Sequence, residues 1–144
     1  MTESKKLSRN GRPVGRPTTR LVKLKVAPTR CPASLHQYLK RIYPFLGFSS
    51  MIELYADILN GFIEKRPWNL GLEWRKPKAV VTKAGGRDNS TGWCQVNIQL
   101  EEALFERVNN LTLETGVARA VFIYTAMYWY AQYEKPPHNL KLSG

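Results

Sequence analysis

In residues 93–100, WCQVNIQL, apolar and polar side chains alternate strictly from Cys94 to Leu100. Alternation sustained over a whole segment predicts a β-strand with one buried face. The polar face carries three uncharged amides, from Gln95, Asn97 and Gln99. Because Asn and Gln can pair bidentately with the major-groove edge of adenine, this face is suited to reading DNA. The alternative at this point is an ordinary solvated strand with neutral polar residues.

A second alternating segment lies earlier, at residues 21–27, LVKLKVA. Its pattern predicts a strand with Lys23 and Lys25 on the wet face and the apolar residues between them on the other. Each predicted strand precedes two helical patterns separated by a break. The predicted helices span residues 32–43 and 50–65 in the first unit, and residues 101–114 and 118–133 in the second. The chain therefore contains an internal repeat.

The spacing of the two units differs between helices and strands. Superposing Gly47 on Gly116 aligns the apolar helix positions with an offset of 69 residues. Placing Lys23 and Lys25 on Gln95 and Asn97 requires an offset of 72. We therefore expect three extra residues in the first unit, around positions 29–31.

The repeat constrains the fold class. A strand–helix–helix unit of about 45 residues cannot bury a core alone, and one strand is not a sheet. Two units solve both problems if residues 21–27 and 93–99 pair antiparallel above four packed helices. The expected fold is mainly α with a short two-stranded antiparallel β-ribbon, arranged as a pseudodimer of repeats 21–66 and 92–134.

This organisation resembles the ribbon-helix-helix (Arc/MetJ-type) superfamily, in which a β-ribbon enters the major groove. The VKLK run at 22–25 resembles TraY-like relaxosome accessory proteins of conjugative plasmids, which have the tandem single-chain form, and the QVN run at 95–97 resembles Arc-type strands. The resemblance covers about residues 20–66 and 92–134. It implies a cytoplasmic protein that binds double-stranded DNA, in the nucleoid or on a plasmid. Its role would be that of a conjugation accessory factor or a transcriptional regulator, with a second copy or a relaxase as a further partner.

The charge distribution favours a polyanionic partner. The formal net charge is +11 at pH 7, and it is uneven. Residues 1–91 hold 18 Lys and Arg against 6 Asp and Glu, whereas residues 92–144 hold 4 against 5. Joined to the predicted ribbon, this excess favours nucleic acid over a generally basic surface. RNA fits less well, because its A-form major groove is too narrow for a ribbon.

Residues 1–20 are predicted to form a disordered basic arm, since they lack apolar periodicity. Gly-Arg-Pro occurs twice, at 11–13 and 15–17, and resembles the core of a minor-groove AT-hook. A simple basic tail is the alternative. The candidate minor-groove residues are Arg9, Arg12, Arg16 and Arg20.

The predicted base-reading residues are Lys23, Lys25, Gln95, Asn97 and Gln99. Ser50-Met51-Ile52-Glu53 has the capping-box pattern, so a helix is expected to start near Ser49 or Ser50. In the ribbon-helix-helix resemblance this helix start anchors a DNA phosphate. The predicted phosphate-binding residues are Arg30, Ser49, Ser50 and Arg119. The alternatives are solubilising lysines and a helix cap without a ligand.

The remaining segments carry no predicted chemistry. Residues 67–91 form a basic, Pro- and Gly-containing linker with a possible short strand near 79–81, and residues 135–144 a disordered tail. Cys31 and Cys94 show no metal-ligand spacing, no run reaches the length of a membrane span, and no catalytic motif occurs. We therefore expect no metal, no cofactor and no enzymatic activity. The competing function is a protein-interaction module, antitoxin-like or a scaffold, in which only the basic arm contacts DNA, without sequence specificity.

Overall fold

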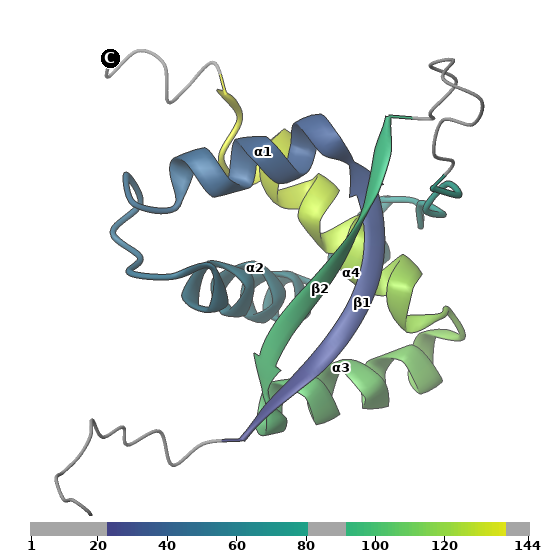
Figure 1. Cartoon of the computed structure of the whole chain (residues 1–144). Helices are drawn as coiled ribbons and strands as arrows, with labels where there is room; N and C mark the ends of the chain where they lie inside the picture. Colours follow the sequence, from purple (N-terminus) through teal and green to yellow (C-terminus); the bar gives the residue numbers. More distant parts are fainter. Residues whose placement is uncertain (1–22, 81–91, 138–144) are drawn as a thin grey trace, which may run out of the picture.

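The computed structural model describes residues 23–80 and 92–137. Two strands, four α-helices and two shorter helical turns occur in these ranges, and the expected mainly helical fold with a two-stranded antiparallel sheet is confirmed (Figure 1). The elements are β1 (Leu24–Pro32), α1 (Ala33–Ile42), α2 (Met51–Lys65), the 3₁₀ turn η1 (Pro67–Leu70), β2 (Trp93–Glu101), α3 (Glu102–Thr115), α4 (Arg119–Trp129) and the π-helical turn η2 (Tyr130–Glu134). The basic arm with its four candidate arginines lies outside the described residues, as does the tail beyond residue 137.

The strands pair antiparallel along their full length, from Leu24 opposite Glu101 to Pro32 opposite Trp93. At one end the Ala33 amide donates to the Gly92 carbonyl at 2.8 Å. Hydrogen-bonded pairs in an antiparallel ladder recur at every second residue. Because Ala33 is hydrogen-bonded, the odd-numbered residues of β1 are those whose backbone groups bond to β2. Pro28 and Pro32 therefore stand where the backbone N–H would point away from the partner strand. This position explains why a strand with two prolines still forms.

The expectation for the first strand was wrong in extent and in phase. The strand runs from Leu24 to Pro32 rather than over residues 21–27, and Val26, expected to be buried, is 54% exposed. The inner face of β1 consists of small residues. They are Ala27, Thr29 and Cys31, which face Ile98, Val96 and Cys94 of β2. Thr29 donates its hydroxyl to the Ala120 carbonyl of α4 at 2.8 Å, so its burial leaves no unsatisfied group.

The three extra residues expected in the first unit, around positions 29–31, do not occur. β1 and β2 begin at Leu24 and Trp93 and end at Pro32 and Glu101, which is an offset of 69 residues at both ends. The same offset relates Gly47 and Gly116, which have left-handed φ angles of 91° and 78° in the breaks between paired helices. One offset therefore aligns strands, helices and turns.

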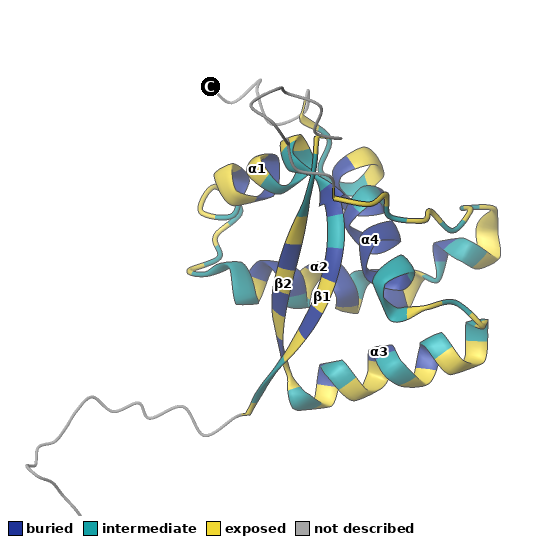
Figure 2. Cartoon of the chain, turned by 45° about the vertical axis from the view of Figure 1, so that its right-hand side comes forward, coloured by how far each residue is buried: buried dark blue, intermediate teal, exposed yellow. Residues whose placement is uncertain are grey.

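The core lies beneath the ribbon, between α2 and α4, with α1 and α3 at its two ends (Figures 1 and 2). Phe62 of α2 is fully buried at its centre, and the Phe122, Trp129 and Trp68 rings lie 5.3, 5.5 and 5.0 Å from it. Trp74 joins the same aromatic cluster, with its ring 5.6 Å from that of Phe122. The described part of the linker therefore packs on the core, although residues 71–80 form no strand.

In the described part of the chain, none of the helices has both the length and the apolar character that crossing a bilayer requires.

Candidate nucleic-acid interface

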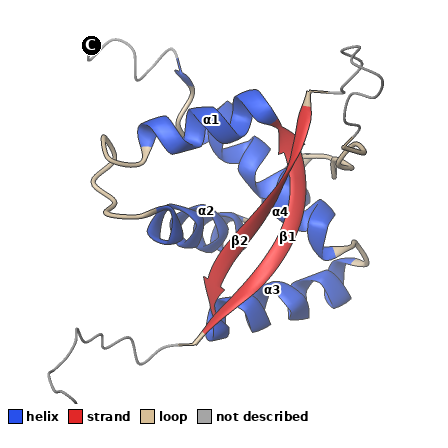
Figure 3. Cartoon of the chain, in the orientation of Figure 1, coloured by secondary structure: helices blue, strands red, loops and turns tan. Residues whose placement is uncertain are grey.

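No helix of the described residues covers the outer face of the ribbon (Figure 3). Three cross-strand pairs form its centre. They are Val26 with Gln99, Pro28 with Asn97, and Arg30 with Gln95. The three amides are exposed, as expected from the alternation in residues 93–100. The uncovered face is therefore amide-rich on β2 and chemically mixed on β1.

Two of the amides are linked along β2. Gln95 donates its side-chain N–H to Oδ1 of Asn97 at 3.2 Å. The Asn97 amide nitrogen keeps its donors, and the Gln95 Oε1 remains an acceptor. The contact aligns the two amides while leaving donor and acceptor atoms for a ligand.

Lys23 and Lys25 do not lie on this face, contrary to the expectation. Lys25 pairs with Leu100 on the inner side of the ribbon and is half-buried at its end, while Lys23 precedes the strand. The reason is the phase of β1, because a one-residue shift moves every side chain to the other face. Arg30, expected just beyond the ribbon as a phosphate ligand, instead stands within it, opposite Gln95.

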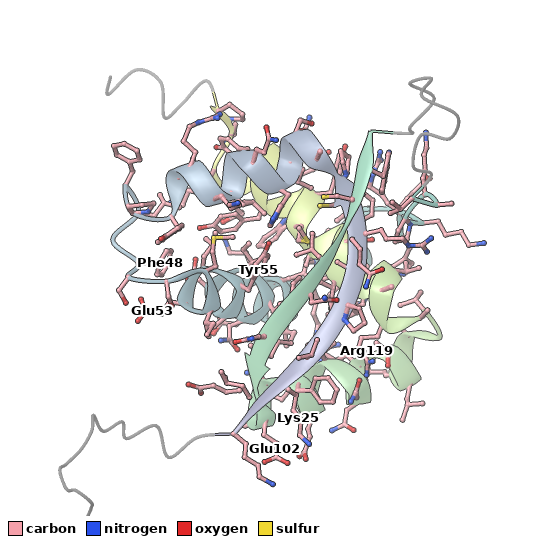
Figure 4. All side chains as sticks on the ribbon, in the orientation of Figure 1. Lys25, Phe48, Glu53, Tyr55, Glu102 and Arg119 are labelled. Carbon is pink, nitrogen blue, oxygen red and sulfur yellow. The ribbon has the colours of Figure 1, made fainter. Side chains whose placement is uncertain are left out.

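The helix start predicted near Ser49 or Ser50 is confirmed, with Ser50 as the N-cap of α2 and the Glu53 carboxylate bound to Ser49 instead of the N-cap amide. The Ser50 hydroxyl accepts from the Glu53 amide at 3.3 Å, and the Glu53 carboxylate accepts from the Ser49 amide and hydroxyl at 2.8 and 2.9 Å. The hydrogen bonds from Ser49 lower the pKa of Glu53. A phosphate approaching this helix start would meet a carboxylate already bound there (Figure 4). The contact predicted for Ser49 and Ser50 is therefore opposed by Glu53.

The start of α4 has the opposite character. Its N-cap residue, Ala118, makes no side-chain cap, and its first turn holds no acidic residue. Arg119 donates to Oδ1 of Asn109 at 3.1 Å, and its guanidinium carbon lies 4.9 Å from the centre of the Phe105 ring. These contacts hold a cation beside uncapped backbone N–H groups. The α4 start is thus the better of the two helix starts for an anion.

Sequence reasoning missed the pairing of the two cysteines. Cys31 and Cys94 face each other directly across the ribbon, and both are free thiols. Burial, with a smaller contribution from Cys94, raises the pKa of Cys31 to about 12. Nearby, the hydroxyl of buried Tyr55 has no hydrogen-bond partner among residues 23–80 and 92–137, and burial raises the pKa of Tyr55. Only the strand register could reveal this pair, since the cysteines are far apart in sequence.

Within residues 23–80 and 92–137, no group of three or more His, Cys, Asp or Glu side chains is placed to hold a metal ion. Comparison with models of protein families, with curated proteins and with solved structures found no match for this chain.

Proposed function

We propose that this chain binds a specific double-stranded DNA sequence by inserting the outer face of its β1–β2 ribbon into the major groove. The uncovered row of Gln95, Asn97 and Gln99, with Arg30 alongside, carries the proposal. A two-stranded ribbon fits a groove about 12 Å wide, and its strands lie about 4.8 Å apart. Alternate residues along a strand are about 6.6 Å apart, close to two base-pair steps, so the three amides span about four steps.

The register supports a pseudodimer of two ribbon-helix-helix units. Pro28 pairs with Asn97, and these two residues are also equivalent under the 69-residue offset. A residue pairs with its own equivalent when a two-fold axis relating the two units passes through that pair. The hydrogen bonds at the ribbon ends obey the same relation. Ala33 donates to Gly92 at one end, and their equivalents, Glu102 and Lys23, form the matching bond at 3.1 Å at the other.

The chemistry of the two strands makes the proposed target asymmetric. Arg30 suits guanine O6 and N7, Asn97 and the glutamines suit adenine, and Val26 suits a thymine methyl group. Under the two-fold relation Val26 corresponds to Gln95, and Arg30 corresponds to Gln99. Because equivalent positions differ in chemistry, the two half-sites should differ in sequence. The unequal helix starts of α2 and α4 support the same conclusion.

The physiological role follows from the resemblance noted in the sequence. We infer either an accessory role in conjugative DNA processing or transcriptional regulation, and assign no catalysis to the chain. The alternative is a protein-interaction module. A groove of about 440 Å³ between η1, the following loop and the end of α4 favours it, because Leu70 at 82% and Tyr133 at 59% exposure lie in its lining.

Selection of bound duplexes from a random pool, followed by affinity measurements, tests the proposal. The double variant Gln95→Ala/Asn97→Ala should bind the selected site at least about 30-fold more weakly, since each of the two bidentate base contacts contributes about 1–3 kcal/mol of discrimination. Binding to scrambled duplex should change little. Gln37→Ala, which removes an exposed amide from α1, is the matched control.

A second comparison separates the two faces of β1. Arg30→Gln should relax sequence preference at one position, whereas Lys25→Gln should leave preference unchanged. Wild-type protein that selects no sequence would contradict the proposal and favour the protein-interaction alternative. Unchanged preference in the Gln95 and Asn97 double variant would exclude the ribbon as the reading element.

A further inference from the structure

The segment that follows η1 is fixed against α4, although it has no regular secondary structure. Trp74 lies in the aromatic cluster around Phe62. One residue later, the Arg75 amide donates to the Thr125 hydroxyl at 3.0 Å. Thr125 is a fully buried polar residue of α4, and this hydroxyl also lies 3.5 Å from the Arg75 carbonyl, to which it donates. We call residues 73–78 the strap, because the core side chain and the backbone contacts hold them across the helix.

The strap carries three exposed cations, Arg75, Lys76 and Lys78. The Arg75 guanidinium lies 3.9 Å from the centre of the Tyr128 ring, so it is directed toward α4. Among the described residues, Lys76 and Lys78 have no carboxylate within ion-pair distance. A hollow of about 210 Å³ lies beside them, lined by Glu73, Trp74, Arg75, Lys76, Lys78, Trp93 and Tyr124. The strap thus places positive charge at a defined position.

Trp93 connects this hollow to the ribbon. It is the first residue of β2 and has the same strand parity as Gln95, Asn97 and Gln99. Its ring lies 5.1 Å from that of Tyr124. The outer face therefore leads into the basic hollow at the end where β2 begins, and Figure 2 shows the segment after η1 running past α4 toward this end.

Among the described residues, the opposite end of the ribbon has no comparable excess of positive charge. Lys23 and Lys25 stand there with Glu101 and Glu102, so the formal charges cancel. Figure 4 places Lys25 and Glu102 together at this end. Strap residues 73–78 carry three cations against Glu73 alone. The net positive charge of the described residues is therefore greater at the Trp93 end.

We propose that the strap is a second DNA contact, in which Lys76 and Lys78 bind backbone phosphates of the duplex flanking the recognition site on the Trp93 side. The proposal rests on the DNA binding proposed above and extends it to a contact outside the ribbon. Each phosphate neutralised by a lysine adds about 0.9 to the slope of log K against log salt. Two lysines therefore account for a slope of about 1.8.

The test compares Lys76→Gln/Lys78→Gln with Lys65→Gln/Lys135→Gln, which removes the same charge near the C-terminal ends of α2 and η2. Affinity for the selected duplex is measured from 50 to 200 mM salt, with backbone footprinting. The strap variant should lose about 1.8 of the slope, bind roughly tenfold more weakly at 100 mM salt and keep its base preference. The control should keep the wild-type slope, because the proposal assigns no phosphate contact to Lys65 or Lys135. Loss of the exposed Lys65–Glu134 ion pair should change the stability of the fold little.

Shortening the DNA provides a second measurement. Removing the flank on the Trp93 side should reduce the wild-type slope as the strap variant does, and it should change the slope of the strap variant little. An unaltered slope in the strap variant, or an equal loss of slope in wild type and strap variant on this truncation, would overturn the strap contact while wild-type recognition stands. If wild type binds no duplex selectively, the proposed function fails and the strap contact fails with it.

Discussion

Linking the thiols of Cys31 and Cys94 tests the register of the ribbon on which the site depends. The two residues are directly opposite and 63 positions apart in the chain. Closing a loop of that length removes unfolded-state entropy worth about 4 kcal/mol at 25 °C. Directly opposite Cβ atoms lie about 4.5–5.5 Å apart, wider than the ~3.8 Å of a relaxed disulfide, so strain subtracts from this gain.

We expect a net stabilisation of about 2–3 kcal/mol, which corresponds to a rise in Tm of roughly 6–12 °C for a chain of this size. The protein is incubated with a small-molecule disulfide, and the product is mapped by peptide mass spectrometry. Thermal unfolding is then compared with and without reductant. Because Cys94 is partly exposed and burial raises the pKa of Cys31 to about 12, Cys94 should react first and Cys31 should complete the link slowly.

Dibromobimane, which becomes fluorescent when it bridges two neighbouring thiols, provides a readout that does not require disulfide geometry. The bridged product should form in folded wild type and be absent from Cys31→Ala. If only the unfolded chain is bridged, or if the link forms between two molecules, the two strands do not lie in the described register. The assignment of Arg30 and the amides to one face would then fail as well.

Three further perturbations address stability. Phe62→Ala should destabilise the protein by about 3–5 kcal/mol in denaturant unfolding, because it empties the centre of the aromatic cluster; a loss below about 1 kcal/mol would contradict that packing. Ser50→Ala should cost about 1 kcal/mol by removing the α2 cap, whereas Ser34→Ala, at an exposed position on α1, should cost little. Burial, and secondarily Lys40, lowers the pKa of His36 below 6.5, so the neutral imidazole is favoured on folding. Stability should therefore fall as pH drops below 6.5, with a smaller fall in His36→Gln, and equal pH profiles would refute this assignment.

Local sequence was sufficient where the structure depends on local chemistry. The capping box at Ser50, the apolar stripes of the helices and the glycines at 47 and 116 all act within a few residues. The strand at Trp93–Glu101 could be predicted with its buried face, because large apolar and polar residues alternate without interruption. These patterns identified the elements and the amide-rich half of the candidate site.

The other half was decided by tertiary structure. In β1 the alternation of Lys with Val and Leu predicted that the even-numbered residues are buried. The structure instead buries the odd-numbered Ala27, Thr29 and Cys31. Small and polar residues carry little hydrophobic signal, and their burial depends on pairing with Ile98, Val96 and Cys94 and on packing over α4. Because a one-residue shift exchanges the faces of a strand, these distant contacts replaced Lys25 with Arg30 on the outer face. The sequence by itself determined that two strand–helix–helix units exist, and only the packed ribbon determined which side chains they present.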